Sequence, residues 1–112
     1  MYLKLSEDGK IFWTKHSKEK MRQYQLSENR LKRVLRNPER KEVGVAPRTI
    51  AIMQTAGTKK HPTEIWLMYQ LIKKPKRMKI ISAWRYPGRS PIGKPPIPED
   101  VLEDLENIFT ET

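Results

Sequence analysis

The sequence predicts an α+β domain: two N-terminal helices packed on a twisted antiparallel sheet of about four strands, followed by a short C-terminal helix. Helix-forming residues with apolar side chains at helical spacing fill residues 16–37. From residue 41 onward, apolar residues instead recur at every second position or in short runs, as in strands. A proline-rich stretch and an acidic amphipathic segment close the chain. Its 112 residues suffice for one domain, so residues 1–112 are taken as a single unit.

Short extended segments at residues 2–5 (Tyr2, Leu3, Leu5) and 11–13 are expected to precede the first helix. That helix runs from His16 to Tyr24, where good helix formers follow one another. His16, Lys20 and Tyr24 are spaced four residues apart, so their side chains lie along one stripe of the helix.

The second helix has the better-marked start. Ser27 is predicted to cap it, because Leu26 before the cap and Leu31 within the first turn are placed to form a hydrophobic staple. The helix is expected to end before Pro38, which restricts the residue preceding it. Its apolar stripe faces the core, and the opposite side carries three cations: Lys32, Arg33 and Arg36.

Four strands are expected at residues 41–45, 49–55, 63–72 and 77–85, joined by short connections that suit antiparallel pairing. The segment EIWLMYQLI is apolar on both faces, as a central strand covered by helices requires. In the last strand, strict alternation puts Trp84 on one face with Ile80 and Ser82. It puts Arg85 on the other face with Ile81 and Ala83.

Residues 86–98 form a proline-rich linker, and residues 98–110 an acidic helix that begins with Pro98 at its first position. Four apolar residues recur at helical spacing in it: Val101, Leu102, Leu105 and Ile108. The helix either folds back over a basic groove and competes with nucleic acid or caps the sheet with its apolar stripe. Because that stripe requires burial, we favour the second interpretation.

The net charge of +10 is unevenly distributed. Residues 98–112 hold six of the 13 acidic residues and none of the 23 basic ones, so residues 1–97 carry a net charge of +16. Such a field favours a polyanionic partner, although a solubilising basic surface is the alternative. The chain has no cysteine, and His16 and His61 lie far apart, so we expect no metal site and no cofactor. No signal peptide or membrane-spanning run is evident, so a cytoplasmic location is expected.

Two segments resemble known families. The first, WTKHSKEKMRQYQLSENRLKRVLRNPER, is similar to the opening of a widespread domain family related to BrnT toxins. The second, KIISAWR, resembles the "ISAR" strand that closes the core of BrnT-type toxins, and both families are similar in layout to the RelE/ParE toxins. The resemblance covers roughly residues 11–86. Trp84, the Tyr86-Pro87-Gly88 sequence and the acidic helix depart from the BrnT pattern.

The resemblance implies two helices on a twisted antiparallel sheet and a separate antitoxin as partner. RelE and BrnT relatives are ribonucleases, so RNA, including ribosome-bound mRNA, is an expected partner, whereas ParE relatives poison DNA gyrase without cutting nucleic acid. The fold therefore leaves the chemistry open.

Metal-independent RNA cleavage needs a base for the 2′-OH, cations for the phosphorane and an acid for the leaving oxygen. Four residues have side chains suited to these roles and are the predicted catalytic residues: His16, Lys20, Arg85 and Tyr86. Lys20 would favour neutral His16, and Arg85 would hold the phosphate. Alternatively His16 only packs, Lys20 is solvated, and Arg85 forms a salt bridge, for example with Glu64.

Nucleic-acid contacts are expected from the cationic helix face, the loops and the end of the last strand. The residues are Lys32, Arg33, Arg36, Lys59, Lys60, Lys73, Lys74, Lys76, Arg77, Trp84 and Arg89. For Trp84, packing beneath a helix is the favoured alternative to stacking on a base. The leading hypothesis is a toxin-type protein that binds RNA and cleaves it. The alternative is a non-catalytic module for structured RNA, the ribosome or a protein.

Overall fold

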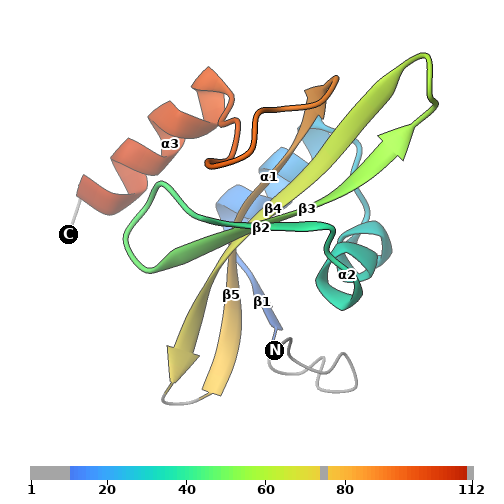
Figure 1. Cartoon of the computed structure of the whole chain (residues 1–112). Helices are drawn as coiled ribbons and strands as arrows, with labels where there is room; N and C mark the ends of the chain where they lie inside the picture. The colour runs from blue at the N-terminus through green and yellow to red at the C-terminus, as the bar shows by residue number, and fades with distance from the viewer. Residues whose placement is uncertain (1–10, 74–75, 111–112) are drawn as a thin grey trace.

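A five-stranded mixed sheet forms the centre of the chain in the computed structural model, which describes residues 11–73 and 76–110 (Figure 1). The elements follow in the order β1 (Ile11–Trp13), α1 (Lys15–Gln23), α2 (Glu28–Arg36), β2 (Arg40–Val43), β3 (Thr49–Gly57), β4 (Pro62–Lys73), β5 (Lys76–Pro87) and α3 (Glu99–Thr110). The strand order is β1-β5-β4-β3-β2. The extended segment expected at residues 2–5 lies outside the described residues.

The α+β class and the antiparallel pairing of β2 through β5 are confirmed. The expectation of a purely antiparallel sheet of about four strands needs correction, because β1 adds a fifth strand, parallel to β5. Ile11 lies opposite Met78 and Trp13 opposite Ile80. A pairing between segments so distant in the chain leaves no local sequence signal, whereas hairpin neighbours are marked by their turns.

Both N-terminal helices begin at side-chain caps. The Thr14 hydroxyl oxygen accepts a hydrogen bond from the Ser17 amide, at 3.0 Å, at the start of α1. Ser27 caps α2 as predicted, accepting from the Arg30 amide at 3.0 Å. Between the helices Gln25 has a φ of +56°, a left-handed conformation that separates α1 from α2.

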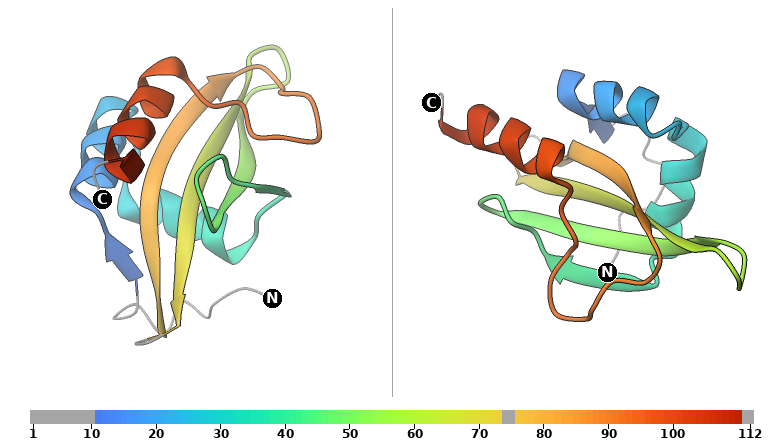
Figure 2. Two further views of the ribbon diagram at one scale, coloured as in Figure 1. Left: turned by 90° about the vertical axis from the view of Figure 1, so that its left-hand side faces the viewer. Right: turned by 90° about the horizontal axis from the view of Figure 1, so that it is seen from above.

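Helices cover both faces of β4, the central strand, as its apolar sequence predicted (Figure 2). Helices α1 and α2 cover one face, where their buried side chains meet Ile52, Ile65, Leu67 and Ile80. On the other face Val101 and Leu105 of α3 pack against Trp66, Met68 and Trp84. Figure 2 also shows α1 and α3 side by side along β5.

A β-bulge changes the face assignment within β5. The register shifts between Met68 and Tyr69, which pair with Ser82 and Ile80, so Ile81 has no residue opposite it. Ile80 consequently belongs to the α1–α2 core, and Ile81 to the α3 core with Trp84. The prediction that Ile80 shares the face of Trp84 and Ile81 that of Arg85 was therefore wrong. One extra residue in a strand reverses the alternation beyond it.

The proline-rich linker is fixed to the sheet by a buried carboxylate. Glu64, 1% exposed, accepts hydrogen bonds from the Ser90 hydroxyl at 2.6 Å and from the Ser90 amide at 3.1 Å. The indole nitrogen of Trp66 also donates to it, at 2.9 Å. Arg40 stacks 5.0 Å above the Trp66 ring and donates to the carbonyl oxygens of Ser90 and Pro91. These contacts determine where the linker delivers α3.

Replacing Glu64 with alanine should destabilise the fold by about 3 to 5 kcal/mol, because the Ser90 amide and the Trp66 indole would remain buried without their acceptor and Arg40 would lose one of its two carboxylates. Urea unfolding followed by circular dichroism measures this loss. Glu103→Ala, at an exposed position of α3, is the matched control and should change stability by no more than about 0.5 kcal/mol. Equal effects of the two substitutions would contradict the role assigned to Glu64.

Candidate nucleic-acid interface

Arg85 holds the C-terminal end of α1 against the sheet. Its Nε donates to the carbonyl oxygen of Tyr24 at 2.8 Å, and Nη2 donates to that of Gln25 at 3.1 Å. The expected salt bridge with Glu64 does not form, because Glu64 faces the opposite side of the sheet and binds Ser90 and Arg40. The partners of Arg85 are neutral, so its positive charge is not cancelled by them.

Arg30 lies near both Arg85 and Arg33. Arg30, in the first turns of α2, donates to the Gln54 side chain at 2.7 Å, and Gln54 lies in the same cross-strand row as Arg85. Burial lowers the pKa of Arg30, the positive charges of Arg33 and Arg85 lower it further, and the carboxylate of Glu39 partly opposes the shift. These three residues, Arg30, Arg33 and Arg85, are called the arginine cluster below. Mutual repulsion among them would be relieved by a bound anion.

A groove of about 380 Å³ opens beside Arg85. It is lined by the half-buried tyrosines Tyr24 and Tyr86, by Arg85 and Pro87, and by residues 96–98 of the linker. Two aromatic rings and a guanidinium group around an open groove are the groups that stack on unpaired bases and bind phosphate. Arg85 and Tyr86 are predicted site residues, whereas the position of Tyr24 in the groove was not predicted.

Trp84, predicted to contact nucleic acid, is fully buried. Its ring stacks on Trp66 with centroids 6.1 Å apart and lies under α3. The alternative interpretation, packing beneath a helix, is confirmed, and a role in base stacking is ruled out in this conformation. The proline-rich linker and α3 cover the face of β5 from which Trp84 projects.

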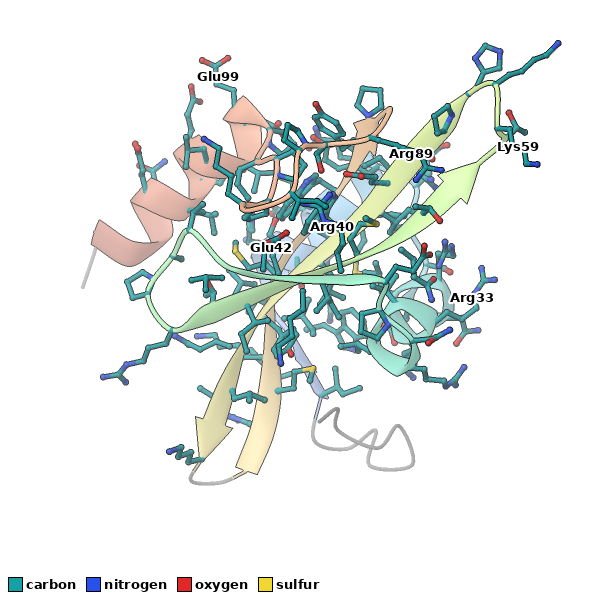
Figure 3. All side chains as sticks on the ribbon, viewed as in Figure 1. Arg33, Arg40, Glu42, Lys59, Arg89 and Glu99 are labelled. Atoms are coloured by element: carbon teal, nitrogen blue, oxygen red, sulfur yellow. The ribbon has the colours of Figure 1, made fainter. Side chains whose placement is uncertain are left out.

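The predicted nucleic-acid contacts divide between two ends of the sheet. Lys59 and Lys60 are exposed in the β3–β4 loop, and the Gly88 amide donates to Pro62 at the base of that hairpin, which brings Arg89 to the same end (Figure 3). Lys73 and Arg77 lie at the opposite end of β4, roughly 35 Å away at about 3.3 Å per residue. A single patch containing all of these residues therefore does not exist.

The other residues predicted to contact nucleic acid lie on α2 and near the connection between β4 and β5. Arg33 and Arg36 are exposed on α2, and Lys32 beside them is half-buried. Lys74 and the side chain of Lys76 lie outside the described residues. Arg77 lies over the exposed ring of Phe12, with 5.6 Å between its guanidinium carbon and the ring centroid. The end that holds Lys59, Lys60 and Arg89 is the one nearest the groove, because Arg85, Tyr86 and Pro87 lead directly into Arg89.

The predicted stripe of His16, Lys20 and Tyr24 exists, but α3 covers it. Lys20 Nζ lies 2.6 Å from Asp100 Oδ2 and 3.0 Å from Asp104 Oδ2, and its side chain is only 8% exposed. The interpretation of Lys20 as a solvated residue was therefore wrong. Burial alone would lower the pKa of Lys20, but hydrogen bonds to the two aspartates raise it above its ordinary value. The pKa of Asp100, which burial would raise, is lowered by the donors that surround it.

His16 lies between a serine and an aspartate. Its Nε2 is 3.3 Å from the Ser82 hydroxyl and its Nδ1 is 3.7 Å from Asp104 Oδ2. The arrangement is reminiscent of a nucleophile, base and orienting acid, but Ser82 is fully buried and cannot reach a substrate here. Burial lowers the pKa of His16, and Lys20 lowers it further, although Asp104 opposes the shift. His16 is thus kept neutral, as a base requires, but it is covered.

Sequence reasoning missed the roles of Arg30, Asp100 and Asp104. The sequence did contain a signal for the aspartates. They are four residues apart, which is also the spacing of His16, Lys20 and Tyr24, so each set lies along one side of its helix and the two sides can face each other. For Arg30 no local signal existed, because its neighbours Gln54 and Arg85 come from distant strands.

No protein-family model, curated protein or solved structure matches this chain. The resemblance to BrnT and RelE/ParE toxins therefore stays a prediction. Within residues 11–73 and 76–110, no three histidine or acidic side chains come together as metal ligands. No helix in this described part is long and apolar enough to span a membrane.

The lowered pKa of His16 predicts a pH-dependent stability. The unfolded chain takes up a proton at His16 near its ordinary pKa of 6.5, whereas the folded chain resists protonation, so the free energy of unfolding should fall as pH drops below that value. Urea unfolding between about pH 7 and about pH 5 should show this loss in the wild type and a flatter profile in His16→Gln. His61→Gln is the control, since His61 is exposed in the β3–β4 loop. A flatter profile for His61→Gln instead would contradict the assignment.

Proposed function

We propose that this chain binds single-stranded RNA at the end of the sheet formed by the arginine cluster, the tyrosine-lined groove and the adjoining cations Lys59, Lys60 and Arg89. The observation that carries the proposal is the arginine cluster beside an open aromatic groove. Among the residues that the structure describes, Arg85 donates to two neutral carbonyl oxygens and to no carboxylate, so its charge is available to an external anion.

Charge distribution supports this choice. Residues 65–98, which include β5 and the linker, contain no acidic residue, so the groove wall has no internal counter-charge from that segment. A phosphate bound by Arg85 would place neighbouring bases next to Tyr86 and Tyr24, which line the same groove. A single strand fits this arrangement better than a duplex, because only unpaired bases expose their faces for stacking.

Binding is favoured over cleavage as the activity of the chain in this conformation. The groups nominated for cleavage chemistry, His16 and Lys20, are covered by α3, and Arg85 already holds the end of α1. While α3 stays on α1, an RNA strand in the groove would meet Tyr24, Arg85 and Tyr86 but not the covered His16 ring. The toxin-type activity and an antitoxin partner stay predictions from the sequence resemblance.

Removing the positive charges of the β3–β4 loop and Arg89 should weaken RNA binding. The variant Lys59→Gln/Lys60→Gln/Arg89→Gln should bind a fluorescent oligouridine of about ten nucleotides at least about tenfold more weakly than the wild type in anisotropy titrations. Its salt dependence should be shallower by about 2 in logarithmic slope, at about 0.7 per phosphate contact.

The matched control removes three cations from the opposite end of the sheet: Arg48→Gln/Lys73→Gln/Arg77→Gln. Arg48 and Lys73 line one cavity there, and all three side chains are exposed. The control variant should bind the oligouridine no more than about threefold more weakly than the wild type. Equal losses in the two triple variants would show that only overall charge matters and would contradict the proposed site.

Tyr86 provides a test of base stacking that leaves charge unchanged. Tyr86→Leu should weaken binding of the same oligouridine by about tenfold, since stacking of one base is worth about 1 to 3 kcal/mol. Tyr86→Phe keeps the ring and should bind like the wild type. If leucine and phenylalanine behave alike, Tyr86 does not stack on the RNA.

A further inference from the structure

The donors on one side of α1 converge on the carboxylates of α3. Asp100 accepts hydrogen bonds from Lys20 Nζ at 2.6 Å, Gln23 Nε2 at 3.0 Å and the Tyr24 hydroxyl at 3.2 Å. Asp104 completes the contact, 3.0 Å from Lys20 and 3.7 Å from the His16 ring. This set of donors, Lys20, Gln23, Tyr24 and His16, is called the α1 stripe below.

The α1 stripe has the chemistry of a phosphate site. An ammonium group, an amide, a hydroxyl and an imidazole are all able to donate to anionic oxygens, and a phosphodiester presents such oxygens as a carboxylate does. The two aspartates therefore stand where phosphate oxygens of a bound strand would lie. The stripe is preorganised, because it lies along one helix held at its end by Arg85.

The contact is separable into a charged part and an apolar part. Asp100 and Asp104 remain 42% and 41% exposed, whereas Lys20 beneath them is 8% exposed. The apolar anchor is provided by Val101 and Leu105, which are buried against the other face of the sheet. Exposed carboxylates bind weakly, since solvent and salt screen them, so an incoming anion can compete for the charged part.

The α1 stripe is continuous with the groove. Tyr24 belongs to both, since its ring lines the groove and its hydroxyl binds Asp100. Linker residues 96–98 line the groove on the other side and lead directly into α3. A strand occupying the groove would thus contact the segment that carries the competing carboxylates.

We infer that the α1 stripe is a second phosphodiester-binding site, occupied in this structure by Asp100 and Asp104 of α3, and that single-stranded RNA competes with α3 for it. The inference rests on the proposed function for the identity of the ligand. The helix acts as an internal competitor that lowers the affinity of the whole surface for RNA.

Neutralising the two aspartates tests this competition. Asp100→Asn/Asp104→Asn should bind the oligouridine at least about fivefold more tightly than a matched variant, Glu99→Gln/Glu103→Gln, which removes the same charge from exposed positions of α3. Glu99 points away from the rest of the molecule (Figure 3). Asparagine keeps the size of aspartate and the apolar anchor is unchanged, so both variants should show the circular dichroism of the wild type.

Adding Lys20→Gln to the Asp100→Asn/Asp104→Asn variant should return its affinity to that of the Glu99→Gln/Glu103→Gln protein. Equal affinities of the two double variants would overturn the inference, because bulk charge alone would then explain any gain. A gain that survives Lys20→Gln would also overturn it, since the RNA would not be using the α1 stripe.

A second readout does not depend on mutation. Amide hydrogen exchange in α3 should become faster when the wild-type protein is saturated with oligouridine, because the strand displaces the helix from α1. Unchanged or slower exchange in α3 would overturn the inference.

The experiments distinguish failure of the proposed function from failure of the inference about α3. If the wild type binds RNA through Lys59, Lys60 and Arg89 but the aspartate variant gains nothing, only the inference fails. If the wild type does not bind RNA, the proposed function fails. The inference then holds only if the aspartate variant binds RNA in a manner that requires Lys20, and absence of such binding overturns it as well.

Discussion

The buried carboxylate of Glu64 is the constraint on which the arrangement of the C-terminal third depends. It binds Ser90, Arg40 and the Trp66 indole, and so fixes a linker that has few apolar side chains of its own to bury. From this fixed point the linker crosses the sheet, lines the groove with residues 96–98 and delivers α3 over Trp84. A buried carboxylate is costly unless it is paired and hydrogen-bonded, and here the Ser90 amide and hydroxyl, the Trp66 indole and Arg40 all donate to it.

Arginines serve as structural clamps on both sides of the sheet. Arg40 joins β2 to the linker, and Arg85 joins β5 to the end of α1. The two differ in their partners. Arg40 has carboxylates beside it, in Glu42 and Glu64, whereas Arg85 has only carbonyl oxygens and lies near Arg30. Arginine therefore pairs with carboxylates on one face of the sheet, whereas on the other face Arg85 is held by neutral carbonyl oxygens beside the groove.

The acidic helix packs on the sheet, as the favoured interpretation predicted, and also binds α1 through its carboxylates. Val101 and Leu105 cover the tryptophans, which is the packing role, and the aspartates on the adjacent side of the helix bind the α1 stripe. These roles are compatible because residues four apart on a helix share a side, and α3 lies in the angle between α1 and the sheet. Protection of the core and occupation of a cationic site thus come from one element.

Local features were determined by the sequence alone. The cap at Ser27, the end of α2 before Pro38 and the antiparallel pairing of β2 to β5 follow from interactions among near neighbours in the chain. Only the tertiary structure decided the parallel pairing of β1, the bulge at Ile81, the neutral partners of Arg85 and the cover that α3 places over His16 and Lys20. Each of these joins segments far apart in sequence, and such contacts depend on how whole elements pack rather than on any local pattern.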